Sequence, residues 1–219
     1  MTRWISRASL AAITVAVSAC ATVKDAAAPM TFFVTSVGLG AGANLGGLEG
    51  ADRHCRILAT DAGAGPRNWR AYLSTQSKDG APLVNARERI GKGPWHNAAG
   101  VLIARDVEDL HGPGNNITKA TALNERGAPT PGRLHDILTG TRVDGYAPSR
   151  LDSDMTCGNW TRNGPEGAAL VGHFDRASAI NEPWARSWNS AHLTRGCNAA
   201  GLAELGSGGL FYCFAELDR

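Results

Sequence analysis

The chain of 219 residues carries 22 lysine and arginine residues against 20 aspartate and glutamate residues, so its formal net charge is only +2. Two of the arginines lie in residues 1–19, and a chain cleaved after residue 19 is therefore formally neutral. Such a chain has no broad basic field that would attract nucleic acid. The about 190 residues that follow the N-terminal segment suffice for one domain with a sizeable core.

The first 20 residues have the pattern of a bacterial export signal. Arg3 and Arg7 precede an uncharged run over 8–19 that is too short to span a bilayer and ends in small residues. The run closes in Val-Ser-Ala directly before Cys20, and this ending resembles the lipobox, in which the cysteine is diacylated and becomes the new N-terminus. An ordinary signal peptide that happens to precede a cysteine is the alternative.

We therefore expect residues 1–19 to be a signal peptide, residues 20–30 a lipidated N-terminus and tether, and residues 31–219 the folded domain. Acyl chains on Cys20 give stable membrane anchoring. Ala21 rather than aspartate follows this cysteine, which in enteric-type sorting indicates the outer membrane. The expected protein is exported and lipid-anchored, facing the periplasm or the exterior.

Export also changes how the four remaining cysteines are interpreted. In an oxidising compartment an even number of cysteines favours a disulfide framework, and four cysteines allow three pairings. A zinc site needs closely spaced pairs, whereas the shortest gap here runs from Cys197 to Cys213. We therefore predict two disulfides and no cysteine-ligated metal.

The domain is predicted to begin with a strand, a glycine-rich turn and a helix. Residues 31–37 are β-branched and aromatic, which predicts a strand. Six glycines between positions 38 and 50 are too many for a helix. An apolar stripe then predicts a helix that buries Cys55 and that Gly63 can end; its members are Ala51, Cys55, Leu58 and Ala62.

A strand followed by glycines also raises the possibility of a dinucleotide fingerprint. That fingerprint needs a helix that begins at the glycines and an acidic residue after the second strand. The segment over 44–47, Asn-Leu-Gly-Gly, would break such a helix, so we reject this interpretation.

The middle of the chain is predicted to be rich in loops. Residues 69–75 alternate apolar and polar side chains, which predicts a strand, and residues 91–103 predict a loop and a short strand with a buried Trp95. Turn-forming residues recur throughout 112–148, with one apolar break at 137–138. The pieces between these turns are too short for helices, and a long irregular region of this kind is usually functional or disordered.

The last third contains ordered motifs that carry a family resemblance. Cys157-x-x-Trp160 precedes Trp188-Asn189, then Cys197, and an aromatic-Cys-x-x-Glu ending closes the domain at Cys213. This order resembles the end of the C-type lectin-like fold, and nearest to it the endostatin domain and bacterial endostatin-like lipoproteins. The resemblance implies an α+β fold with a mixed, mainly antiparallel sheet, one main N-terminal helix and long disulfide-pinned loops.

The same resemblance implies how the cysteines pair. In the family, the first and last cysteines join the helix to the final strand, and the middle two pin the loop region. Carried over, this pairing joins Cys55 to Cys213 and Cys157 to Cys197.

Calcium is the one cofactor that the resemblance raises, because many lectins of this fold hold it with carboxylate and amide oxygens. Those lectins have Glu-Pro-Asn and Trp-Asn-Asp clusters. This chain instead reads Asn181-Glu182-Pro183, in the wrong order, and Trp188-Asn189-Ser190, with serine in place of a ligand aspartate. We therefore expect neither a calcium site of that type nor another metal or cofactor.

Aromatic side chains offer a calcium-free route to a ligand. Trp184 and Trp188 are four residues apart in the region that forms ligand-facing loops in the lectin relatives, and a tryptophan face beside forked donors suits sugars and proteins alike. Trp184 is the better surface candidate, because the counterpart of Trp188 in the fold belongs to the core. The candidate ligand-binding residues are Trp184, Arg186, Trp188, Asn189 and His192.

No sequence motif supports catalysis. The chain lacks metalloprotease, nucleophile-elbow and phosphate-loop patterns, and its six histidines are scattered singly. His135 precedes Asp136, but neighbours in sequence need not touch. We expect a non-enzymatic envelope module that binds carbohydrate or an extracellular or host protein, lectin-like or adhesin-like. The alternative is a structural lipoprotein that contacts peptidoglycan or other envelope proteins.

Overall fold

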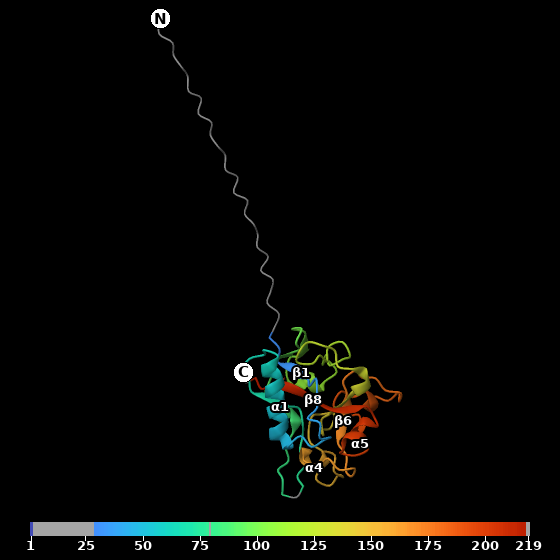
Figure 1. Ribbon diagram of the computed structural model, residues 1–219. Coiled ribbons are helices and arrows are strands. Elements are labelled where there is room, and N and C mark those ends of the chain that lie inside the picture. The colour runs from blue at the N-terminus through green and yellow to red at the C-terminus, as the bar shows by residue number, and fades with distance from the viewer. Residues whose placement is uncertain (2–28, 79, 218–219) are drawn as a thin grey trace.

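The computed structural model describes Met1 and residues 29–78 and 80–217 of the chain (Figure 1). The expected export signal beyond Met1, the expected lipidation site Cys20 and nearly all of the expected tether lie outside these residues. Within the described residues, no helix has the length and apolar character needed to cross a membrane.

A six-stranded sheet within the described residues organises the domain, with the strand order β1-β8-β5-β6-β7 and β2 paired to β8. All of its strand pairs are antiparallel except β5 with β8. Two further strands, β3 and β4, form a separate hairpin. The strands are β1 (Phe32–Val34), β2 (Trp69–Ala71), β3 (Trp95–His96), β4 (Leu102–Ala104), β5 (Asp136–Leu138), β6 (Leu170–His173), β7 (His192–Leu193) and β8 (Ser207–Ala215).

Helix α1 is the longest helix of the described residues and lies beside β1 and β8 (Figure 1). The expectations of an α+β fold, a mainly antiparallel sheet and one main N-terminal helix are thus confirmed. The other helices are short. The helices are α1 (Gly47–Asp61), α2 (Ala86–Arg89), α3 (Val107–His111), α4 (Cys157–Trp160) and α5 (Ala199–Ala203), with 3-10 turns η1 (Gly132–Leu134) and η2 (Trp184–Arg186).

The expectation that the glycine-rich segment stays outside the helix was wrong at its end. Helix α1 begins at Gly47 and includes Gly50. A Cβ atom at Gly50 would lie 2.0 Å from the carbonyl oxygen of Leu45. The chain therefore needs glycine here so that the preceding loop can fold back against the first helical turn.

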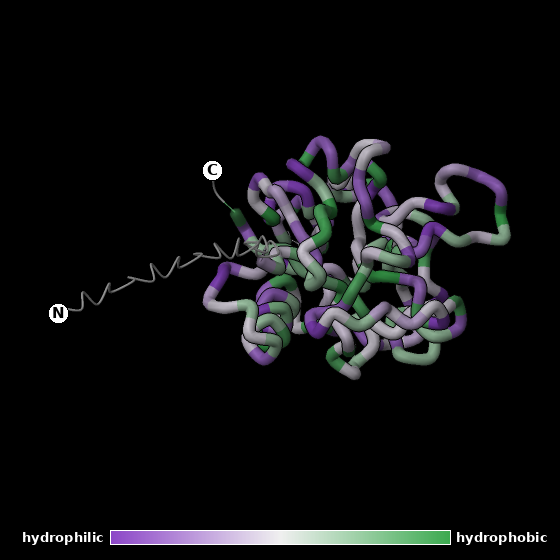
Figure 2. The backbone as a smooth tube through the Cα atoms, turned by 90° about the horizontal axis from the view of Figure 1, so that it is seen from above, coloured by the Kyte–Doolittle hydropathy of each residue, from purple (hydrophilic) through white to green (hydrophobic). Residues whose placement is uncertain are grey.

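Alternation along β8 creates two cores, one on each face of the sheet. Phe211, Cys213 and Ala215 belong to a core under α1, while Leu210, Tyr212 and Phe214 belong to a core on the opposite face. Successive side chains of a strand point to opposite faces, so one strand can serve both cores. In Figure 2 the hydrophobic segments run through the middle of the molecule, and hydrophilic segments are most frequent in the loops around it.

The turn-rich region over 112–148 contributes a central strand that was not predicted. Its apolar break forms β5, which pairs with β8 on one side and β6 on the other. Ile137 and Leu138 are fully buried on opposite faces, one in each core. Three residues suffice because neighbouring strands on both sides satisfy their backbone groups.

A buried carboxylate ties α1 to β2 and α2. Asp52 is 3% exposed, and its oxygens accept hydrogen bonds from the backbone N–H of Ala71 at 2.8 Å and from Arg70 and Arg89 at 3.1 and 2.8 Å. Charged donors on a buried carboxylate offset the cost of removing it from water. This contact fixes the helix against the edge of the sheet.

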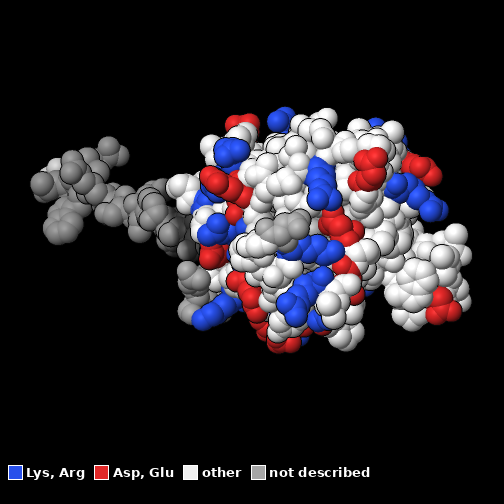
Figure 3. Space-filling model, turned by 90° about the horizontal axis from the view of Figure 1, so that it is seen from below, with Lys and Arg blue, Asp and Glu red and all other residues white. Residues whose placement is uncertain are grey.

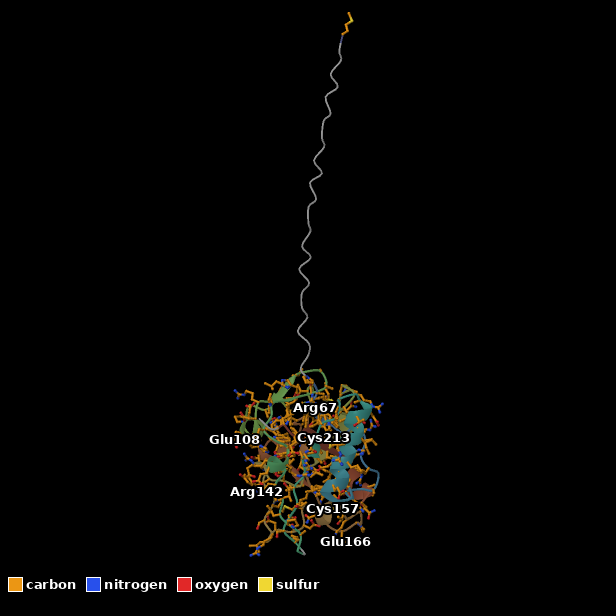
Figure 4. The ribbon with its side chains drawn as sticks, turned by 90° about the vertical axis from the view of Figure 1, so that its left-hand side faces the viewer. Arg67, Glu108, Arg142, Cys157, Glu166 and Cys213 are labelled. Carbon is orange, nitrogen blue, oxygen red and sulfur yellow. A yellow bond between two sulfur atoms is a disulfide. The ribbon has the colours of Figure 1, made fainter. Side chains whose placement is uncertain are left out.

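Both disulfides form, with the pairing that the resemblance implied. Cys55 of α1 bonds Cys213 of β8, and Cys157 bonds Cys197. Figure 4 places Cys213 near the middle of the domain and Cys157 towards its lower end. One bridge therefore joins the main helix to the central strand, and the other pins the loops.

Removal of each disulfide is expected to lower the free energy of unfolding by a different amount. On the chain-entropy model, the sequence separations of 158 and 40 residues correspond to about 5 and about 4 kcal/mol. The four cysteines are fully buried, so alanine pairs leave comparable cavities. Urea unfolding should show both double variants destabilised, with Cys55→Ala/Cys213→Ala lower than Cys157→Ala/Cys197→Ala by about 1 kcal/mol. The reverse order would contradict this account.

Candidate functional site

A cleft of about 520 Å³ opens on the loop face of the domain. Four separate segments form it: the end of α3, the turn at 142–143, Arg176, and the loop over 183–190. The lining residues are His111, Gly112, Asn115, Arg142, Val143, Arg176, Pro183, Trp184, Arg186, Ser187, Trp188 and Ser190. The cleft thus combines residues from distant parts of the sequence.

The lining carries three arginines and no carboxylate. Arg176 lies half-buried; its Nε–H donates to the carbonyl of Ile117 at 2.8 Å and its terminal nitrogen to the amide oxygen of Asn115. Burial lowers the pKa of Arg176 below its ordinary value, which reflects the cost of a desolvated cation. Among the described residues, no carboxylate lies within ion-pair distance of Arg176 or Arg186.

Arg142 differs from the other two arginines because it has an acidic neighbour. Its guanidinium lies 3.0 Å from Asp144, and both side chains are about half exposed. Figure 4 shows Arg142 on the same side of the domain as Glu108. On the face shown in Figure 3, by contrast, basic and acidic side chains are interspersed. Within the cleft, the positive charges of Arg176 and Arg186 have no acidic neighbour in the lining.

Trp184 supplies an exposed aromatic surface at the cleft. Its side chain lies in the 3-10 turn η2 and is 52% exposed. Trp188 is only 3% exposed and packs on Tyr72 and Tyr212 at centroid distances of 4.9 and 5.3 Å. One tryptophan is thus available to a ligand, while the other joins the cleft to the core.

Asn189 lies beneath the cleft and is fully buried. Its amide nitrogen donates to the hydroxyl of Tyr72 at 3.0 Å and to the carbonyls of Arg142 and Val143 at 3.2 Å each. Its amide oxygen accepts from the hydroxyl of Ser187 at 2.9 Å. Asn189 therefore positions two walls of the cleft through its amide.

His111 extends the same network. Its Nδ1 lies 2.7 Å from the carbonyl of Val107 and its Nε2 lies 2.7 Å from the hydroxyl of Tyr72. A carbonyl only accepts, so the neutral ring carries its proton on Nδ1 and accepts from Tyr72 at Nε2. Burial lowers the pKa of His111 and raises that of Tyr72, and both groups stay neutral at pH 7.

The structure separates the residues selected from the sequence. Trp184, Arg186 and Trp188 line the cleft, and Asn189 lies under it. His192 is on β7 outside the lining, where its Nε2 is 3.5 Å from Asp136, and this carboxylate raises its pKa. Sequence reasoning missed His111, Asn115, Arg142 and Arg176, which stand singly in turn-rich segments and carry no motif.

The cleft does not fit calcium. Ca²⁺ takes six to eight oxygen ligands and usually several carboxylates. The amide oxygen of Asn189 is already hydrogen-bonded to Ser187, Ser190 supplies no charge, and no lining residue is acidic. The positive lining favours an anion over a divalent cation.

Comparison with known proteins adds no relative: no protein-family model matches the chain, and no curated protein matches it. The assignment of the site therefore depends on its geometry and chemistry.

Replacement of Asn189 tests its role in positioning the cleft. Asn189→Ala leaves the carbonyls of Arg142 and Val143 without their donor, and we expect a loss of about 1–3 kcal/mol in the free energy of unfolding. Asn181→Ala is the matched control, because Asn181 is exposed and bonds only Arg186. Urea unfolding measures both, and equal effects would contradict the role.

The buried His111 predicts a pH dependence. Because its pKa is lowered from 6.5 in the folded state, its contribution to stability is complete above pH 6.5 and is lost as the pH falls towards the folded pKa. His192 has a raised pKa and acts in the opposite direction. Stability measured between pH 7.5 and pH 5, values chosen to bracket about 6.5, should fall more for the wild type than for His111→Asn. Parallel profiles would contradict the prediction.

Proposed function

We propose that this domain is a non-enzymatic binding module of the cell envelope that recognises saccharides carrying an acidic group, with the arginine-rich cleft as its binding site. The observation that carries the proposal is the half-buried guanidinium of Arg176, which has no carboxylate partner among the described residues and faces a cleft without acidic side chains.

The chemistry of the lining suits an acidic sugar. A guanidinium presents forked donors that match the two oxygens of a carboxylate, sulfate or phosphate group. Trp184 offers the apolar face on which a pyranose ring can stack. Arg186 and Trp184 both line the cleft, so one ligand unit can contact both.

Two structural features support the proposed family and location. The helix-to-strand bridge and the loop bridge have the arrangement expected of an endostatin-like member of the C-type lectin-like fold. Disulfides persist in oxidising compartments, which favours an exported protein. We propose that lipid on Cys20 holds this domain at the outer membrane.

An array of neutral, carboxylated and sulfated glycans, with peptidoglycan fragments included, tests the proposal. The chain from Ala21 onward should bind acidic members, with affinity that falls as salt rises. Calcium should have no effect. Equal binding of neutral and acidic members would contradict the proposal, and binding to none, with co-purification of envelope proteins, would favour a structural role.

Variants of the cleft should weaken this binding. Arg176→Gln and Arg186→Gln each remove a charged donor, worth about 1.5–3 kcal/mol or roughly ten- to hundredfold in affinity. Trp184→Ala should cost about 1 kcal/mol or more. Arg150→Gln, an exposed site outside the lining, is the control. Calorimetry with the best array ligand measures all four, and unchanged affinity in Arg176→Gln would assign the ligand elsewhere.

A further inference from the structure

Three imidazoles surround the buried carboxylate of Asp136. Its Oδ1 lies 3.2 Å from Nε2 of His173, 3.5 Å from Nε2 of His192 and 3.3 Å from Nε2 of His135. The Nε2 atoms of His173 and His192 are 3.0 Å apart. None of these four residues lines the arginine-rich cleft, so they form a separate cluster.

The register of the sheet explains the convergence. Asp136 of β5 is directly opposite His173 of β6, and His192 of β7 is opposite Val171. Directly opposed residues share a face, as do residues two apart in one strand. Asp136, His173 and His192 therefore project from the same face of three neighbouring strands.

Asp136 has imidazoles at ion-pair distance but no aligned hydrogen bond from the described residues. It is fully buried, and within the described residues neither of its oxygens receives a hydrogen bond of acceptable geometry. The nearest imidazole nitrogens lie 3.2–3.5 Å from Oδ1. Nδ1 of His173 is also buried without a partner. A buried carboxylate and a buried imidazole nitrogen without aligned hydrogen bonds require an explanation, and a bound ion is one.

The separations match those of ligand atoms around a small dication. Zinc bonds imidazole nitrogen and carboxylate oxygen at about 2.0–2.2 Å, and a tetrahedron of that size has ligand atoms about 3.3 Å apart. The three distances among Asp136, His173 and His192 are 3.0, 3.2 and 3.5 Å. The rings of the two histidines are inclined at 64°, which allows both planes to contain one metal.

We propose that Asp136, His173 and His192 bind a Zn²⁺ ion, with the fourth coordination position open. An N/O ligand set of this kind suits first-row dications, and a tetrahedral arrangement favours zinc among them. The ion neutralises the buried carboxylate and joins β5, β6 and β7.

His135 borders this position and is not one of the ligands. Its ring stacks on His173 with centroids 4.4 Å apart and planes 14° apart. An imidazole nitrogen binds a metal in the plane of its own ring. Because the two rings are stacked, a metal in the plane of His173 lies outside the plane of His135. The side chains of His135 and His192 are 26% and 30% exposed, so solvent contacts the cluster at these two rings.

The full chain, purified in detergent and stripped of metal with a chelator, should bind one equivalent of Zn²⁺ in calorimetry. Bound Co²⁺ should show the intense visible absorption of a tetrahedral site. His192→Gln and Asp136→Asn should each weaken Zn²⁺ binding by roughly 100-fold or more, since even partners beyond the direct ligands cost about 10–100-fold. His135→Gln should change the affinity far less.

His96→Gln is the matched control, because His96 lies on β3, away from the cluster. Circular dichroism verifies the fold of each variant; His192 is at the edge strand and partly exposed, so His192→Gln remains informative if Asp136→Asn does not fold. Absence of stoichiometric binding, or unchanged affinity in His192→Gln, would overturn the proposal. Glycan binding by the arginine-rich cleft is measured separately, so the two proposals can fail independently.

Discussion

The pairing of β8 with three other strands is the constraint on which the rest of the fold depends. This nine-residue strand pairs with β1, β2 and β5, and its alternating side chains enter both cores. The bridge at Cys213 fixes α1 to the same strand. The other strands of this sheet are two to four residues long, and so short a strand has little stability by itself. The short strands β1, β2 and β5 therefore depend on β8 for their stability.

Contacts with this strand also hold the residues that form the cleft. The hydroxyl of Tyr212 on β8 donates to the carbonyl of Trp188 at 2.9 Å, and Trp188 packs on Tyr72. Asn189 then carries the connection to the turn at 142–143. A loop surface that is anchored to a core in this way loses little conformational entropy when it binds a ligand. The proposed metal cluster at Asp136 depends on the same sheet through β5.

The parts of the fold that were predictable have local signals. An apolar stripe through Cys55 indicated α1, and the expected export signal together with an even cysteine count indicated two disulfides. The strand β5 was missed because three residues show no periodicity, and its burial depends on neighbours distant in sequence. Arg176 was missed because a single charged residue carries no motif, and Asp136 was considered only as the sequence neighbour of His135. A single charged residue is chemically ordinary until the fold removes its water or gathers other groups around it.

The position of β8 in the chain has a consequence for the order of folding. The strand follows all of its partners in sequence. In a chain that is synthesised from its N-terminus, neither of the two cores can be completed before residues 207–215 are available. Phe32, Phe33 and Trp69, which are buried in the folded domain, lack their β8 partners until that point. Until its last strand is in place, a chain with this exposed apolar surface is prone to aggregation.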